Sequence, residues 1–457
     1  MACHAQDLSL RPSAYQPRRP ERTVLYQTVQ KELESWLAAT SEPIPHFVEQ
    51  EFRSFLKCGI LAYGFARAHC NQCGHDSLVA FSCKGRGICP SCNTRHMAQI
   101  AAHLTENVFP KLPVRQWVLS FPKRIRYFLA SNPQIVSAVM NILITAIETR
   151  LRIAGSRASP LPKNCRLGAV TFIQRFGKAL NPHFHFHSCV IDGLFDREGS
   201  FYPTNNLSPE DIHATQEHIR KRVLRLFRAK GLIDSDAASD MLEWENSGFS
   251  LNANVRIEAH DREGLERLIR YCARPVFASE RLDRAFESLR YALPKATPEG
   301  QTVLLLKPKE LLDKLAQLIP PPRRHRHHYH GVLAPSSPQR LKVTGSPAKS
   351  QKDNASEELS PSLSPANQLP PQEPIRKSPK PASLYRWALL MARIYEINPL
   401  SCPKCTHPMR IIAFIQDRPT ICKILNHIQE PSNPPPISPA RGPPEPEFNY
   451  DQTYEFA

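Results

Sequence analysis

Three histidines at every second position carry the first chemical signal in the sequence. In the segment NPHFHFHSCVIDG, His183, His185 and His187 alternate with Phe184 and Phe186. Because successive side chains of a strand point to opposite faces, the histidines share one face and the phenylalanines turn toward the core. Neutral imidazoles at i and i+2 can chelate one divalent cation, although a single histidine on a strand is usually polar surface. With few carboxylates nearby, such an ion keeps open positions and suits catalysis at a phosphate.

A tyrosine among arginines supplies the nucleophile that such chemistry requires. Tyr271 lies late in an amphipathic helix expected over 261–272, near Arg267, Arg270 and Arg274. A phenolate can attack phosphorus and form a covalent phosphotyrosine, and arginines hold phosphate and stabilise the phenolate. The competing interpretation is a core tyrosine of an ordinary amphipathic helix.

Cysteines at metal-ligand spacing form a second signal. Cys70-x2-Cys73 is followed after fifteen residues by Cys89-x2-Cys92. Two such turns typically build the closed tetrahedral site of structural zinc, so we expect Zn²⁺ on these four cysteines. The alternative is a set of reduced cysteines that only pack. Neighbours that could replace a ligand or build a second site are Cys58, Cys83, His69, His75 and His96.

A further pair, Cys402-x2-Cys405, is half of a zinc site. His407, Cys422 and His427 are the residues nearby that could complete it. Around the first cluster stand Lys84, Arg86 and Arg95, which fit contacts to DNA phosphates and fit equally a solvated basic face.

The overall charge points to a polyanionic partner. The chain of 457 residues has 59 Lys+Arg against 42 Asp+Glu, a net charge of +17. A surplus of this size favours nucleic acid as the partner, the alternative being a basic protein without one. The N-terminus lacks the basic start and apolar run of a signal peptide, and we expect no membrane span. The 13 cysteines are therefore expected to be reduced.

The elements that must position these side chains can be predicted from periodicity. Tracts of apolar or alternating residues, bounded by Pro, Gly and Asn, predict strands over 117–121, 167–176 and 183–195 and helices over 132–155, 208–230 and 261–272. The connection GKALNP predicts an antiparallel hairpin between the second and third strands. The order strand–helix–strand–strand–helix predicts an α+β domain with helices on one face of the sheet.

Several long motifs in a fixed order resemble the HUH superfamily of single-strand endonucleases, with His185–Phe186–His187 as its histidine–hydrophobic–histidine motif. More narrowly, the chain resembles rolling-circle insertion-sequence transposases that carry an N-terminal zinc-binding transposase domain. The segments that carry the resemblance are FSCKGRGICPSCNTRHMAQIAAHL (81–104), VRQWVLSFP (114–122), FIQRFGKALNPHFHFH (172–187), RYCARPVFASERL (270–282), RHHYHGVLAP (326–335) and NPLSCPKCTHPMRIIAFIQD (398–417).

The resemblance implies a fold and a mechanism. It implies a palm-like antiparallel sheet with flanking helices, on which His185 and His187 bind Mg²⁺ or Mn²⁺. Tyr271 would attack one DNA strand and leave a 5′-phosphotyrosine and a free 3′-OH. The zinc region would recognise the terminal DNA of the element. The implied partners are single-stranded DNA at the element ends and target site and the host replication machinery, in the cytoplasm and nucleoid of a bacterium.

The chain departs from one branch of this family and leaves two points open. That branch has two tyrosines spaced Y-x-x-x-Y, whereas Arg267 stands four positions before Tyr271, so the chain resembles a single-tyrosine member. The second strand transfer would then reuse Tyr271 or use a second subunit. For the third metal ligand we favour Gln174, on the partner strand of the hairpin, over His183.

The domain organisation follows from the motifs and from composition. Residues 336–382 are rich in Ser, Pro, Lys and Gln and contain no aromatic residue, which predicts a disordered linker. The expected units are a helical lead-in (1–40), a zinc-binding DNA-recognition domain (41–113), the HUH endonuclease domain (114–335), the linker, a small C-x2-C segment (383–430) and a disordered tail (431–457).

Other functions compete with the transposase. The nearest enzymatic rival is a plasmid replication initiator or relaxase with the same chemistry, and a different class is a zinc-dependent DNA-binding protein that does not cut. As DNA-binding residues we expect Arg86, Arg95, Arg270 and Arg274. The basic segment RRHRHHYHG (323–331) fits either a DNA contact or a solvated loop before the linker.

Overall fold

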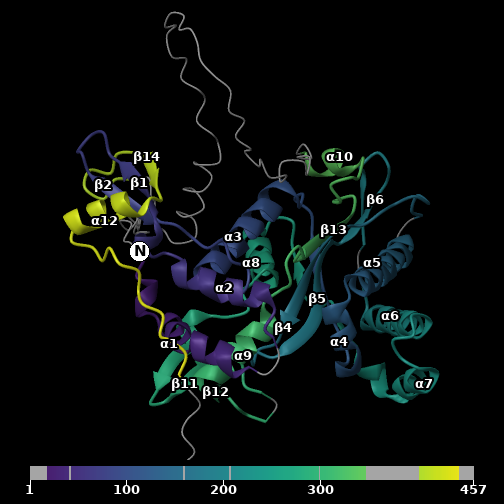
Figure 1. Ribbon diagram of the computed structural model, residues 1–457. Coiled ribbons are helices and arrows are strands. Elements are labelled where there is room, and N and C mark those ends of the chain that lie inside the picture. Colours follow the sequence, from purple (N-terminus) through teal and green to yellow (C-terminus); the bar gives the residue numbers. More distant parts are fainter. Residues whose placement is uncertain are drawn as a thin grey trace, which may run out of the picture.

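A six-stranded antiparallel sheet forms the centre of the computed structural model, which describes residues 18–40, 43–157, 160–204, 207–297, 299–345 and 401–441 (Figure 1). In spatial order the strands are β13 (His327–Gly331), β4 (Gly168–Phe176), β5 (Pro182–Ile191), β3 (Val114–Ser120) and β8 (Ser250–Asn252), with β9 (Arg256–Ile257) also paired to β3. Every pairing in this sheet is antiparallel. The predicted strands and the predicted hairpin between β4 and β5 are confirmed.

The register of the hairpin places the polar residues of two strands side by side. Gln174 on β4 lies opposite His185 on β5, and Phe172 lies opposite His187. On the other side of β5, Ser120 of β3 lies opposite His185. The strand β5 ends at Ile191, earlier than predicted, and residues Gly193–Phe195 form a separate strand, β6, that pairs with β7 (Phe201–Pro203).

The break after β5 is made by Asp192, a buried carboxylate at the turn. It accepts hydrogen bonds from the guanidinium groups of Arg115, at 3.0 and 3.1 Å, and of Arg256, at 2.7 Å. Its own backbone N–H donates to the carbonyl oxygen of Pro113. The residue therefore ties the end of β5 to the neighbouring strands and has a structural role at this turn.

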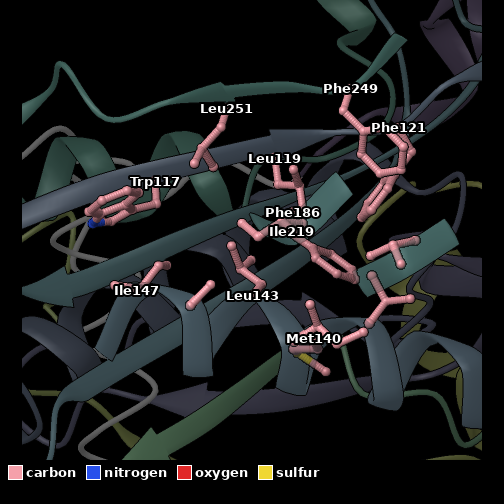
Figure 2. Packing of buried hydrophobic residues seen from close by; sticks show 14 of the residues in the cluster. Trp117, Leu119, Phe121, Met140, Leu143, Ile147, Phe186, Ile219, Phe249 and Leu251 are labelled. Carbon is pink, nitrogen blue, oxygen red and sulfur yellow. The ribbon is translucent and has the colours of Figure 1, made fainter. Parts of the chain in front are cut away.

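One face of the sheet is covered by helices that follow β3 and β7. These are α4 (Lys123–Ser131), α5 (Pro133–Ser156), α6 (Pro209–Ala229) and α7 (Ser235–Glu243). Phe184 and Phe186 of β5 are buried there, and Phe186 meets Phe121 edge-on at 5.2 Å between ring centroids. Figure 2 shows Phe186 among side chains of α5, including Met140 and Leu143. Because burying each such side chain contributes about 1.5–3 kcal/mol, this face fixes the orientation of the strand.

The opposite face is covered by α3 (Pro90–Asn107) and α8 (Arg262–Cys272), so the sheet has helices on both sides (Figure 1). The prediction of helices on one face is therefore wrong. The reason is that α3 belongs to the segment expected to form the zinc-binding domain, yet Ile100 and Leu104 share a hydrophobic cluster with Val170 and Phe172 of the sheet.

A second core joins the N-terminal helices to a later part of the chain. Its elements are α1 (Val24–Ala39), α2 (His46–Lys57), β10 (Leu282–Ala285), β11 (Ser288–Ala292), β12 (Val303–Leu306) and α9 (Pro308–Leu318). The indole N–H of Trp36 donates to the Asp313 carboxylate at 2.7 Å. This core unites segments that the sequence places in different domains.

The C-terminal segment lies against the N-terminal region. A three-stranded sheet has the order β14 (Arg410–Ile415), β1 (Phe65–His69), β2 (Asp76–Ala80), and α12 (Arg418–His427) packs on it. Residues 431–441, predicted as part of a disordered tail, instead run along α1, where the side-chain amide of Gln30 donates to the carbonyl oxygen of Pro436 at 2.6 Å. Ile437 joins the second core, which explains the order of this proline-rich stretch.

The first residues of the predicted linker, up to 345, lie within the described part of the chain. Residues 340–344 form the short helix α10 (Arg340–Thr344), anchored by buried Arg340, which donates to the carbonyl oxygen of Leu333. The rest of the predicted linker, the order expected at 384–400 and the last 16 residues lie outside the described residues. By length and composition alone, α5 is the one helix among the described residues that could span a membrane, and here its apolar side chains pack on the sheet.

Candidate active site and metal centres

The histidine face of β5 presents two buried imidazoles. The side chains of His185 and His187 are only 6% and 3% exposed. The Nδ1 atom of His185 lies 3.0 Å from the carbonyl oxygen of His183, and the Nδ1 atom of His187 lies 2.9 Å from the side-chain amide of Gln116. Nε2 of His187 is buried and has no hydrogen-bond partner. Burial lowers the pKa of His185 to about 3, which keeps the ring neutral, the form that binds metal.

Gln174 presents a second buried acceptor on the same face. Its amide N–H₂ group donates to the carbonyl oxygens of Tyr271, at 3.2 Å, and Cys272, at 2.8 Å. The amide is thereby held in place, and its Oε1 atom is buried without a partner. A buried polar atom without a partner costs about 1–3 kcal/mol. A cation would pair with Oε1 of Gln174, and with Nε2 of His187 when the ring proton is on Nδ1.

His183 is the less suitable third ligand. It lies on the same face at the start of β5, with its ring centroid 4.8 Å from that of His185. Burial lowers the pKa of His183 to about 4, and the nearby charge of Arg126 adds to the effect. Unlike Gln174, it is not held by hydrogen bonds to α8, so the geometry favours Gln174.

Tyr271 stands at the edge of this face, near the end of α8. The helix begins at the N-cap Asp261, whose carboxylate accepts from the N–H of Gly264, and it buries Leu268 and Ile269 against the sheet. The Tyr271 ring is perpendicular to that of His187 at 5.6 Å between centroids, and the side chain is 48% exposed. The phenol is therefore beside the histidines and open to a substrate.

Of the three arginines expected around Tyr271, only Arg274 contacts its ring. Its guanidinium carbon lies 4.8 Å from the ring centroid, and its Nε atom is buried without a hydrogen-bond partner. Arg270 is instead paired with Glu266 at 2.8 Å, and Arg267 lies 3.7 Å from Glu263. The expectation of a three-arginine cluster is corrected, because acidic residues one turn back on α8 hold the other two.

Two further tyrosines lie in other surroundings. Tyr291 is buried in the second core and stacks on Phe277 at 5.4 Å. Tyr329, on β13, is covered by the guanidinium of Arg340 at 5.2 Å. Both have structural partners, whereas Tyr271 is open to solvent.

A basic pocket adjoins the histidine face. It lies between β4, the end of α8, α3 and the segment that leads into β13, and the residues that line it include Gln174, Cys272, His96, Arg175, Arg274, Arg324, His325 and Arg326. No carboxylate occurs among the described residues that line it. Burial lowers the pKa of Arg326 to about 10, and the charge of Arg86 contributes. Such a group is stabilised by an anion, which makes the pocket suitable for a phosphate.

The basic segment 323–331 connects this pocket to the zinc region. Arg326 donates to the side-chain oxygen of Asn93 at 3.1 Å, and Arg86 donates to the backbone carbonyl of Arg324 at 2.8 Å. Arg95, also expected to contact DNA, donates to the Ser82 hydroxyl at 3.3 Å. The later part of the segment forms β13, so the interpretation as a solvated loop is wrong for these residues.

The first cysteine group consists of Cys58, Cys83, Cys89 and Cys92. Cys58 follows α2, Cys89 is the N-cap of α3 and Cys92 lies in its first turn. Sulfur–sulfur distances are 3.5 Å for Cys83–Cys92, 3.6 Å for Cys58–Cys89 and 3.7 Å for Cys58–Cys92. Four sulfurs at the usual 2.3 Å from a tetrahedral zinc are about 3.8 Å apart, so this group fits zinc.

The second cysteine group consists of Cys70, Cys73, Cys402 and Cys405. The predicted grouping of the first two with Cys89 and Cys92 is therefore corrected. Cys70 and Cys73 lie at the tip of the β1–β2 hairpin, whereas Cys89 and Cys92 lie where α3 begins beside the end of α2. Neither group includes His407, Cys422 or His427, the residues considered for the second site.

Sequence reasoning missed several functional candidates. Gln116 on β3 lies beside His187 only because of the sheet register, and no local pattern marks it. Arg175 lines the basic pocket directly after Gln174. The acidic partners of Arg267 and Arg270 were marked by a visible signal, since Glu263 and Glu266 each stand four residues before them.

The cysteine groups are suited to zinc and the basic pocket to an anion, and two comparisons with known families match these parts of the chain. Residues 28–121 match the family described as "Transposase zinc-binding domain", and residues 168–340 match the family described as "Putative transposase". The two matches are consistent with an insertion-sequence transposase with an N-terminal zinc-binding domain. No curated protein and no solved structure matches the chain. The zinc-binding match and the cysteine groups together support Zn²⁺ as a cofactor.

Proposed function

We propose that the protein is a rolling-circle transposase that nicks and rejoins single-stranded DNA through Tyr271. The observation that carries the proposal is the combination of two buried polar atoms without partners, Nε2 of His187 and Oε1 of Gln174, with an exposed tyrosine ring 5.6 Å from His187. Structural side chains do not leave buried acceptors unpaired without a cost.

In this proposal one set of residues binds the metal ion and Tyr271 is the nucleophile. His185, His187 and Gln174 would hold Mg²⁺ or Mn²⁺, which when bound supplies a Lewis acid that polarises the scissile phosphate. The Tyr271 hydroxyl gives its proton to solvent as its oxygen attacks phosphorus, the bond from phosphorus to the 3′ oxygen breaks, and that oxygen takes a proton from solvent and leaves as a 3′-OH. The product is a 5′-phosphotyrosine, which a 3′-OH attacks in the reverse sense to rejoin the strand.

Arg274 and the basic pocket would position the DNA. The unpaired Nε–H of Arg274 lies beside the nucleophile and suits a phosphate oxygen. Arg175 and Arg326 line the adjoining pocket, where a neighbouring phosphate of the strand would offset the repulsion of Arg175 by Arg324 and of Arg326 by Arg86. Arg86 and Arg95 connect this surface to the zinc-binding domain, which would recognise the ends of the element.

The two family matches support a transposase rather than the alternative functions. A plasmid initiator or relaxase would use the same residues, but the two family matches are to transposase domains. The substrates would be single-stranded DNA at the element ends and at the target, and the free 3′-OH would pass to the host replication machinery. Arg267 occupies the position of a second tyrosine, so the second transfer would reuse Tyr271 or recruit a second subunit.

The test is covalent trapping of labelled single-stranded DNA from the ends of the element. Wild type, Tyr271→Phe and Tyr127→Phe are compared with and without Mn²⁺, at constant zinc. Tyr127 is the control because it is 74% exposed but lies on α4, on the other face of the sheet. We expect an Mn²⁺-dependent protein–DNA adduct in wild type and Tyr127→Phe and none in Tyr271→Phe. An adduct in Tyr271→Phe would show another nucleophile, and DNA binding without any adduct would favour the non-cutting alternative.

A further inference from the structure

The two cysteine pairs of the second group lie in turns of the same construction. In the first turn the carbonyl oxygen of Cys70 accepts from the N–H of Gly74 at 2.9 Å, and its own N–H donates to the carbonyl five residues ahead at 2.9 Å. In the second turn the carbonyl oxygen of Cys402 accepts from the N–H of Thr406 at 2.8 Å. The N–H of Cys402 donates to the carbonyl oxygen of His407 at 2.9 Å. Gly74 and Thr406 both have positive φ, 70° and 61°. Such paired turns are the usual way in which proteins present two thiolates to one ion.

Sheet pairing brings these turns together from distant parts of the chain. The strand β1 runs into the first turn and β14 leaves the second, and they pair antiparallel from Phe65 opposite Ile415 to His69 opposite Arg410. Ile421 of α12 packs into the same small core. The facing cysteines are 329 and 335 positions apart in sequence.

The four sulfurs form a closed set. Cys70 and Cys405 are 3.5 Å apart and Cys73 and Cys402 are 3.4 Å apart, with all four within 4.8 Å of one another. A disulfide would require about 2.05 Å between sulfurs, whereas zinc ligands stand about 3.8 Å apart. No position is left for water or substrate, which is the arrangement of a structural ion.

We propose that Cys70, Cys73, Cys402 and Cys405 bind a second structural Zn²⁺ that fastens the C-terminal segment 401–441 to the zinc-binding domain. The protein then holds two zinc ions per chain, and half of the second site lies outside both matched family segments. The ion would join the two cysteine turns at the end of the three-stranded sheet and so keep β14 and α12 beside β1. This inference does not depend on the nuclease chemistry.

The first measurement is the zinc content of the full chain, by elemental mass spectrometry on protein purified with a reductant. Wild type should contain two zinc ions, and the double variants Cys70→Ser/Cys73→Ser and Cys402→Ser/Cys405→Ser should each contain one. Cys422→Ser is the matched control, because Cys422 lies on the neighbouring helix α12 but in neither group, and it should keep two. One zinc in wild type, or Cys70–Cys405 and Cys73–Cys402 disulfides in the purified chain, would overturn the proposal.

A second measurement tests whether the zinc ion keeps the C-terminal segment bound to the rest of the chain. A specific protease site is inserted between residues 346 and 400 of the full chain, and the cut protein is passed over a sizing column. The C-terminal fragment should stay bound in wild type and in Cys422→Ser, and should separate with Cys402→Ser/Cys405→Ser or after a chelator. Retention in the serine variant would show that β14 and α12 hold by packing alone. Because neither measurement uses DNA, its failure is distinguishable from failure of the proposed nicking activity.

Discussion

The histidine face of β5 and the cysteine group beside α3 are both suited to metal, and they differ in completeness. At the cysteine group three of the sulfur–sulfur distances are 3.5–3.7 Å, and all four sulfurs lie within 4.8 Å of one another. On the histidine face, Gln174 and His187 each have a buried polar atom without a partner, and a half-exposed tyrosine stands next to them. A closed ligand set therefore holds a fold together, whereas an incomplete set beside a nucleophile leaves room for a substrate.

The largest expected effects are a loss of activity from changes on the histidine face and a loss of stability from changes in the cysteine group. We expect His187→Gln to reduce adduct formation by more than ~100-fold, since even second-shell changes at metal sites cost ~10–100-fold, while the thermal unfolding midpoint changes little. Cys89→Ser should instead lower that midpoint strongly, because structural zinc contributes on the order of 10 kcal/mol to folding. Trapping assays and calorimetry on the same preparations check both. If His187→Gln unfolded the chain, or if Cys89→Ser left its stability intact, the contrast would be broken.

Gln116 tests how the histidine face is set up for metal. The structure places the amide nitrogen of Gln116 2.9 Å from Nδ1 of His187 and 3.3 Å from the Cys272 sulfur, which leaves the ring proton on Nε2. For Nε2 to bind an ion, the Gln116 amide must turn so that its oxygen accepts the proton of Nδ1. We expect Gln116→Leu to raise the Mn²⁺ concentration needed for half-maximal adduct formation by ~10–100-fold. The matched variant Gln116→Glu retains an acceptor and should stay near wild type. An equal loss in both variants would mean that the amide donates to the ring.

A smaller effect should distinguish two arginines on either side of Tyr271. Arg274 has a buried unpaired Nε–H, whereas Arg270 is engaged by Glu266 at 2.8 Å. Losing one charge-assisted hydrogen bond of about 1.5 kcal/mol should slow adduct formation about tenfold in Arg274→Gln. Arg270→Gln should change it by less than about twofold. Equal losses in single-turnover rates would show that both arginines face the phosphate.

The arrangement of the histidine face could be predicted from the sequence because it is local. Period-two alternation placed Phe186 in the core, and a short hairpin connection brought Gln174 opposite His185. Gln116 could not be found in this way, because its place depends on how β3 docks on β5. A hairpin fixes its register through its turn, whereas the pairing of distant strands depends on the whole core.

The grouping of the cysteines failed for the same physical reason. The spacing of C-x2-C shows that each pair forms a turn, but it carries no information about which turns meet. Cys73 lies nearer in sequence to Cys89 than to Cys402, and yet its sulfur is 3.4 Å from that of Cys402. The charge pattern of α8 was readable, since Glu266 stands one turn before Arg270, and it would have shown that this arginine is already engaged.

The pairing of β14 with β1 also orders events during synthesis. A chain emerging from the ribosome completes β1 and β2 long before residues 410–415 exist, so one edge of β1 stays unpaired until translation is almost finished. An unpaired strand edge is a template for aggregation, and closing a loop of more than 300 residues is slow. Truncated chains that end before residue 401 would keep that unpaired strand edge and the free thiols of Cys70 and Cys73. We expect such chains to aggregate or to be degraded.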